Sequence, residues 1–250
     1  MDRDNTIVVK LSGRFFGDPQ EPWKVNPLLM FVVMTLEGWV RDSQKRCVVV
    51  VVGGGNVIRG RDIPKEFANE MGFRRVVDLM GMLSSRVNGE ILYQLFLGTG
   101  LMTEHLTSQY GSPDLATQLF TPSKLEVAVD NNNFVVLSSG VEPGVSTDTR
   151  AVEIALALGS CLLLKLTTDI LGLHEIDPRV NSTAKLLREA SYADLANLGA
   201  GVVFDSGAIA KAEKGGVKIR ILNPHPSNCL TNNLQEALRD HTHFIGTTVG

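Results

Sequence analysis

The sequence predicts an α/β fold in which helices cover both faces of a largely parallel sheet. Stretches of helical length separate most of its short apolar, β-branched segments, and this alternation is typical of a parallel sheet. Five consecutive valines at 48–52 indicate a strand buried on both faces. With 250 residues, 44% of them hydrophobic, the chain can form a large core. The predicted strands lie near 6–11, 47–52, 134–138, 160–166, 201–204, 217–222 and 244–249.

The first predicted strand contains a lysine between apolar neighbours. It ends in Lys10, Leu11, Ser12 and Gly13. A lysine in a buried strand needs a partner for its ammonium group, and a phosphate is one such partner. The alternative is an edge strand from which Lys10 extends into water.

Two apolar helices are predicted in the first hundred residues. The segment 28–40 has few polar positions, and apolar residues recur at helical spacing from Val76 to Leu95. Both helices fit a protein core. A helix as apolar as 28–34 can also pack against another subunit, so we expect a homo-oligomer.

The valine strand leads into a glycine loop, Gly53-Gly54-Gly55-Asn56-Val57-Ile58-Arg59-Gly60. Because glycine lacks a Cβ atom, a phosphate can approach the backbone N–H groups there, and Arg59 adds a planar set of donors. An ordinary turn from strand to helix remains the alternative. The sequence matches neither the P-loop nor the dinucleotide-binding fingerprint.

Farther along, residues 105–132 lack a regular pattern and are interpreted as a surface or lid-like connection. Ser146, Thr147, Asp148 and Thr149 then form the expected start of a helix that runs to about Leu158.

Four polar clusters follow predicted strands, at Lys10–Gly13, Gly53–Arg59, Gly140–Asp148 and Lys165–Asp177. We expect them to meet at the carboxyl edge of the sheet. Two lysines, glycine N–H groups and a helix N-terminus suit the charge of a phosphoryl group in transfer. Asp148 would orient the lysines, or else act only as a favourable charge at the start of its helix.

Composition excludes several other classes. The formal net charge is −3, so nucleic acid is not an expected partner. Cys47, Cys161 and Cys229 are widely spaced, which predicts free thiols, no zinc site and a cytoplasmic protein. No apolar run reaches membrane-spanning length. His241 and His243 alternate near a strand, a pattern more typical of an exposed surface than of a metal site.

Several motifs, in order, resemble the bacterial-type uridylate kinases of the amino acid kinase superfamily. The resemblance spans nearly the whole chain, and the most discriminating segment is Asp78-Leu79-Met80-Gly81-Met82-Leu83. The other motifs are Val9–Gly13, Gly53–Gly60, Ser146–Thr149, Leu164–Thr167, Asp177-Pro178, Asp205–Lys211, Ile219–Asn223 and Gly246-Thr247.

The resemblance implies one three-layer α/β/α domain over residues 1–250. The half at about 1–145 would bind the phosphate acceptor, UMP, and the half at about 146–250 would bind ATP. It also implies ATP-dependent phosphorylation of UMP in pyrimidine nucleotide synthesis, with magnesium bridging phosphates, in a homohexamer.

The resemblance further assigns roles to single residues. The catalytic set is Lys10, Arg59, Asp148 and Lys165, and Asp78 would lie at the head of its helix, beside UMP. ATP would contact Lys10, Leu11, Ser12, Gly13, Gly55, Arg59, Thr167 and Asp177. UMP would contact Gly54, Asp78, Gly140, Val141, Glu142, Pro143, Gly144, Val145, Ser146 and Thr147.

Three segments depart from the family's pattern. Arg14 stands where the family usually has Glu, residues 139–143 replace its Gly-Thr-Gly-Asn-Pro loop, and residues 167–172 lack its lysine. These departures leave two alternatives open. One is a non-catalytic nucleotide-binding or storage protein, as molybdenum storage proteins are. The other is a kinase with another small acceptor.

Overall fold

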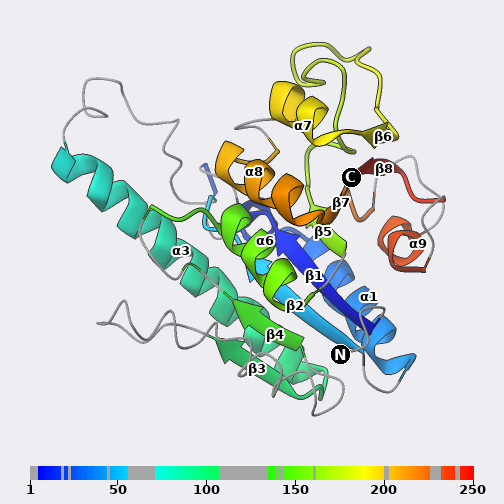
Figure 1. Cartoon of the computed structure of the whole chain (residues 1–250). Helices are drawn as coiled ribbons and strands as arrows, with labels where there is room; N and C mark the ends of the chain where they lie inside the picture. Colours follow the sequence, from blue (N-terminus) through cyan, green and yellow to red (C-terminus); the bar gives the residue numbers. More distant parts are fainter. Residues whose placement is uncertain are drawn as a thin grey trace.

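The computed structural model describes residues 5–17, 20–21, 24–43, 46–55, 71–106, 135–138, 140, 144–159, 162–199, 203–225, 232–239 and 243–250. Within these ranges no helix has both the length and the apolar character needed to cross a bilayer. The described strands form one eight-stranded sheet in the order β3-β4-β2-β1-β5-β7-β8-β6. Figure 1 shows this sheet between two helical layers, the three-layer α/β/α arrangement that the sequence predicts.

The sheet is parallel except where β8 meets β7, and that pair is antiparallel. The most apolar strands, β1 and β2, lie at its centre, as expected for strands that need cover on both faces. The strands are β1 (Thr6–Leu11), β2 (Cys47–Val52), β3 (Thr103–Leu106), β4 (Val135–Ser138), β5 (Leu162–Leu166), β6 (Glu189–Ala190), β7 (Lys218–Leu222) and β8 (Gly246–Val249).

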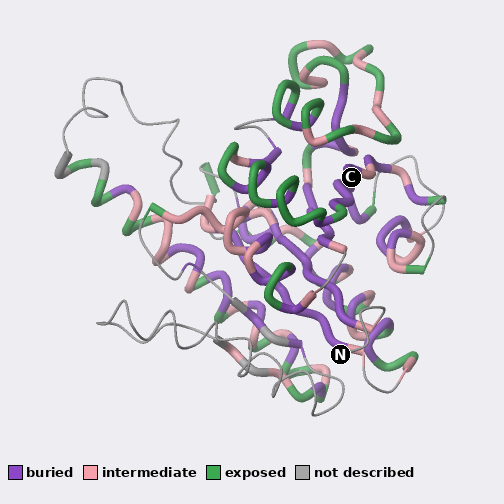
Figure 2. The backbone as a smooth tube through the Cα atoms, in the orientation of Figure 1, coloured by how far each residue is buried: buried purple, intermediate pink, exposed green. Residues whose placement is uncertain are grey.

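Alternate residues of the central strands belong to two separate cores. Val8, Val49 and Leu163 pack in the core beneath α6 (Thr147–Ala157), α7 (Tyr192–Gly199) and α8 (Ser206–Gly215). Their neighbours Val9 and Val50 pack in the second core, beneath α1 (Leu28–Arg41), α3 (Met71–Gly98) and α9 (Asn233–Arg239). Because side chains alternate along a strand, Lys10 and Lys165 lie on the α6 side with Val8 and Leu163. Figure 2 shows the buried strands between partly exposed helices.

The two predicted apolar helices are confirmed as α1 and α3. The apolar side of α1 packs into the core with Leu29, Val32 and Leu36, while Met30 and Met34 stay exposed. Cys47 is a buried free thiol whose pKa burial raises to about 12; Cys161 and Cys229 lie outside the described residues.

The prediction of a strand over 201–204 is wrong for residues 203 and 204, the two that the structure describes. Val203 lies in a turn and Phe204 in a single isolated bridge. Both backbone N–H groups donate to the Gly199 carbonyl, at 2.8 and 3.2 Å, so these two residues close the end of α7 and do not form a strand.

Two short strands at opposite edges of the sheet were not predicted. β3 begins just before the predicted connection 105–132, and β6 has two residues. Neither has an apolar alternating pattern, and each pairs with one neighbour, β4 or β8. Pairing with that neighbour, which local sequence does not reveal, makes them strands.

Candidate active site

Two buried lysines lie side by side at the centre of the sheet. Lys10 on β1 is the register partner of Lys165 on β5. Only 3% of Lys10 and 6% of Lys165 is exposed. The sheet register therefore brings two lysine side chains from positions 155 residues apart onto the face that α6 covers.

Asp148, in the first turn of α6, lies between these ammonium groups. Its Oδ1 accepts a hydrogen bond from Lys165 Nζ and lies 3.6 Å from Lys10 Nζ. Burial by itself would raise the pKa of Asp148, but Lys165 and Lys10 together outweigh burial and lower it. The geometry thus matches the predicted arrangement of one carboxylate between two lysines.

Burial has the opposite effect on Lys10. Desolvation, with repulsion from Lys165, lowers the pKa of Lys10 to about 7, while Asp148 and Asp205 act to raise it. The Lys10 ammonium also donates to the Leu11 carbonyl at 2.8 Å. A group with this pKa changes its charge near neutral pH, so an anion beside it would draw it toward the charged form.

Lys165 has a further contact with the turn before α8. Its Nζ lies 4.9 Å from the centre of the Phe204 ring, and Asp205 follows. The Asp205 carboxylate caps α8 by accepting the Ala208 N–H at 2.8 Å, and it also accepts the Ser146 hydroxyl. Ser146 Oγ in turn accepts the Thr149 N–H at 2.9 Å. Asp205 therefore joins the starts of α6 and α8 and helps to fix Asp148.

A cavity of about 290 Å³ lies beside this centre. Its lining includes all the described residues that the resemblance assigns to the acceptor. Two lining residues adjoin the centre formed by Lys10, Lys165 and Asp148. Gly54 follows Gly53, which lies beside Lys10, and Thr147 precedes Asp148. The lining residues are Gly54, Gly55, Val77, Asp78, Gly81, Met82, Gly140, Gly144, Val145, Ser146 and Thr147.

The glycines at this edge also have a packing role, which the sequence reasoning did not predict. A Cβ atom added to Gly54 would lie 2.2 Å from the Gly81 carbonyl oxygen, and one added to Gly140 would lie 2.5 Å from Ser85 Oγ. At Gly53 it would lie 3.0 Å from Lys10 Nζ. Gly54 and Gly140 need glycine because helix α3 occupies the space, and a side chain at Gly53 would be crowded by Lys10, whatever ligand binds beyond them.

Polar side chains of α3 hold the strand ends in this position, and the sequence reasoning missed them. Asn88 Nδ2 donates to the Gly53 carbonyl at 2.8 Å, and Ser84 Oγ donates to the Gly54 carbonyl at 2.9 Å. Ser85 Oγ accepts the Gly140 N–H at 2.5 Å, and Arg86 Nε donates to the Gly140 carbonyl at 3.0 Å. The cluster of four polar residues within an apolar helix was the sequence signal that could have indicated this role.

One prediction on α3 is corrected. Asp78 does not lie at the head of its helix, because α3 already begins at Met71. It contributes to the cavity from the third turn. In the same segment, Met80 is 41% exposed, and Met82 lines the cavity.

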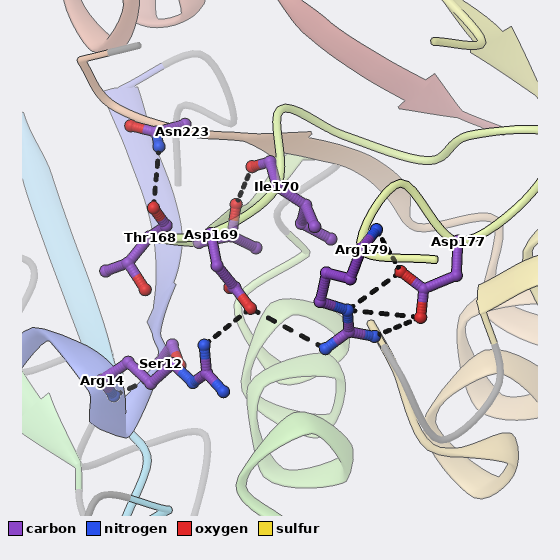
Figure 3. Close-up of polar contacts among 9 residues, drawn as sticks. Ser12, Arg14, Thr168, Asp169, Ile170, Asp177, Arg179 and Asn223 are labelled. Atoms are coloured by element: carbon purple, nitrogen blue, oxygen red, sulfur yellow. Dashed lines mark hydrogen bonds and ion pairs between the residues drawn. The ribbon is translucent and has the colours of Figure 1, made fainter. Parts of the chain in front are cut away.

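The loop after β5 forms the other side of the site. Thr167 is 5% exposed, and its hydroxyl donates to the Ile170 carbonyl at 2.6 Å, which holds the loop closed. Asp177 binds Arg179, whose Nη2 lies 2.7 Å from its Oδ2 (Figure 3). Opposite this loop, Ser12 Oγ accepts the Arg14 N–H at 3.4 Å.

Comparison with known proteins decides the family. Residues 5–223 match the amino acid kinase family. The chain belongs to the amino acid kinase family. Within this family its curated relatives include the uridylate kinase of Chlamydia muridarum (strain MoPn / Nigg), 30% identical over 88% of both chains. Another is the uridylate kinase of Chlamydia pneumoniae, 33% identical over 81% of this chain and 77% of that protein.

Solved structures show the amino acid kinase fold as well. The UMP kinase from Bacillus anthracis superposes with a TM-score of 0.78 over 98% of this chain and 96% of that one, at 23% identity. The predicted resemblance to bacterial-type uridylate kinases and the predicted fold class are therefore confirmed.

The roles that the resemblance assigns to single residues stay predictions. Arg59, Val141, Glu142 and Pro143 lie outside the described residues, as does His241. In the part of the chain that the structure describes, no group of three or more His, Cys, Asp or Glu is arranged to hold a metal ion.

Proposed function

We propose that this protein catalyses the ATP-dependent phosphorylation of UMP to UDP. One observation supports this more than any other: the cavity is lined by Gly54 and Thr147, which adjoin the centre formed by Lys10, Lys165 and Asp148. The 30–33% identity to uridylate kinases over most of the chain supports UMP as the acceptor.

In this proposal the acceptor occupies the cavity lined by α3 and the start of α6. Its phosphate lies near Ser146 and Thr147, where the positive end of the helix dipole favours an anion. Asp78 lines this cavity and would accept hydrogen bonds from the nucleoside. The donor lies toward the Ser12–Gly13 turn and the loop that contains Thr167, on the other side of the lysines.

The transfer itself needs no covalent intermediate on the protein. An oxygen of the UMP phosphate forms a bond to the γ-phosphorus of ATP while the bond to the β,γ-bridging oxygen breaks, and ADP leaves. Lys10 and Lys165 stabilise the negative charge on the group in transfer, and Asp148 keeps both lysines in place.

Magnesium fits this site only as a partner of the phosphates. Asp148 is already paired with two lysines, and the structure has no carboxylate cluster among its described residues. Mg²⁺ keeps several waters and commonly binds through substrate phosphates, so the nucleotide would bring most of its ligands. When bound, it neutralises phosphate charge.

Several finer features belong to the proposal as well. They are one domain with an acceptor half and an ATP half, a role in pyrimidine nucleotide synthesis, a cytoplasmic location and a homohexamer. The exposed apolar residues Met30 and Met34 on α1 fit a subunit contact. The uridylate kinase relatives do not favour the storage alternative.

Magnesium- and ATP-dependent ADP release tests the proposal, with UMP, CMP, dUMP and a panel of small carboxylates offered separately. We expect turnover with UMP and little with the others. Turnover with a carboxylate alone would support the kinase with another acceptor. ATP binding without turnover on any acceptor would support the non-catalytic alternative.

Nucleotide binding should also take up a proton. With a pKa of about 7, Lys10 is mostly neutral in the free protein at about pH 8. Bound phosphates raise that pKa, so we expect an uptake on the order of one proton per nucleotide. Calorimetry in two buffers of different ionisation enthalpy measures it. The same heat in both buffers would contradict a neutral Lys10.

A further inference from the structure

Arg14 places a positive charge beside the turn that follows β1. It belongs to the short 3-10 helix η2 (Gly13–Phe15), directly after Ser12. Its Nη1 donates to Asp169 Oδ2 at 2.8 Å, and the two side chains are 31% and 32% exposed. Arg14 and Thr168 also line a second cavity, of about 330 Å³. The guanidinium is therefore accessible from a hollow next to the proposed donor site.

Asp169 also faces a second arginine. Arg179 Nη1 lies 3.8 Å from the same Asp169 oxygen. Arg179 is held by Asp177, whose carboxylate accepts from its Nε at 2.9 and 3.2 Å and from its Nη2 at 2.7 Å. These bonds lower the pKa of Asp177 to about 2. Figure 3 shows the alternating row Arg14, Asp169, Arg179 and Asp177.

The ion pair between Arg14 and Asp169 can be exchanged for a pair between Arg14 and a phosphate. Among the described residues, Asp169 is the ion-pair partner of Arg14, through one nitrogen and one oxygen. A partly exposed pair of this kind is weak, whereas a phosphate can accept two parallel N–H bonds from an arginine. If Arg14 turned away, Asp169 would still face Arg179, so the exchange would not leave a carboxylate unpaired.

The loop under Asp169 is fixed, so it would not follow Arg14. Asn223, which is 8% exposed, donates to the Thr168 carbonyl at 3.1 Å. The Thr167 N–H donates to the Leu222 carbonyl at 3.0 Å. Asp169 is thus an anchored acceptor, and the Arg14 side chain is the part that can move.

We propose that Arg14 exchanges Asp169 for a phosphate of the donor nucleoside triphosphate. Arg14 is then a further donor-binding residue, and Asp169 competes with the nucleotide for it. The identity of the donor as ATP rests on the function proposed above. The consequence is specific: removing Arg14 weakens nucleotide binding, and removing the charge of Asp169 strengthens it.

Arg14→Gln and Asp169→Asn test this by calorimetric titration with magnesium ATP, without an acceptor. We expect Arg14→Gln to raise the dissociation constant about tenfold, the effect of one charge-assisted contact. Asp169→Asn should lower it about two- to fivefold. Arg41→Gln is the matched control, because Arg41 pairs with Glu37 at 2.9 Å on α1, away from the site, and should bind as the wild type does.

The double variant separates competition from simple structural loss. If Asp169 acts only by holding Arg14, the double variant binds as weakly as Arg14→Gln alone. Equal weakening by both single variants, or no effect of either, would overturn the proposal. Tight magnesium ATP binding without UMP turnover would contradict the function proposed above. Even then, opposite changes of the dissociation constant in the two single variants would support the role of Arg14. No binding to the wild type would overturn both.

Discussion

The rate of UMP phosphorylation should fall by on the order of a hundredfold or more in the Lys10→Met variant, because this variant lacks the preorganised positive charge that stabilises the transferred group. Methionine has a similar length and suits a position that is 3% exposed. Lys165 still pairs with Asp148 in this variant. Initial rates at saturating ATP and UMP measure the effect.

The fold should survive this change. Burial lowers the pKa of Lys10 to about 7, below its ordinary value of 10.5. The unfolded chain therefore binds a proton at Lys10 more tightly than the folded protein does. As a result, this lysine destabilises the folded state most below about pH 7 and not at all above pH 10.5. We expect Lys10→Met to unfold at the same or a higher temperature than the wild type at about pH 7.

Lys218→Met is the matched control, since Lys218 is exposed at the first residue of β7. It should keep wild-type turnover. Asp148→Asn gives an independent check, because Asp148 raises the pKa of Lys10. In that variant turnover should fall by on the order of a hundredfold, and the alkaline loss of activity should move to lower pH. Unchanged turnover in both Lys10→Met and Asp148→Asn would exclude the proposed mechanism.

The Gly54→Ala variant should show the largest loss of stability among single changes at the site. Its new Cβ atom would lie 2.2 Å from the Gly81 carbonyl oxygen and 2.7 Å from the Ser85 nitrogen, both backbone atoms of α3. Helix α3 must then shift away from the end of β2. We expect a loss of about 1–3 kcal/mol or more in the free energy of unfolding, measured by urea denaturation.

Gly38→Ala is the control for this change. Gly38 lies within α1, and a Cβ atom there meets nothing within 4 Å. Alanine favours a helix over glycine, so this variant should gain about 0.5–1 kcal/mol. A Gly54→Ala protein as stable as the wild type would mean that α3 does not pack on this glycine as described.

The sequence by itself determined the strands of the central sheet and several of the positions that meet at the candidate site. Apolar β-branched runs are a local signal, and so is the serine cap at Ser146, which the structure confirms with the Thr149 N–H. A lysine in a buried strand also indicated a charged site without any structure. The failures were the segment 201–204 and the edge strands β3 and β6, where pairing partners rather than local composition decide the structure.

Only the tertiary structure decided how these positions meet. The order of strands makes Lys10 and Lys165 register partners, and the packing of α6 brings Asp148 between them. The packing of α3, not a ligand, explains why Gly54 has no room for a side chain. The pairing of Arg14 with Asp169 joins residues 155 positions apart. Such contacts depend on strand order and on how helices pack across the sheet, and neither is a property of any short stretch of sequence.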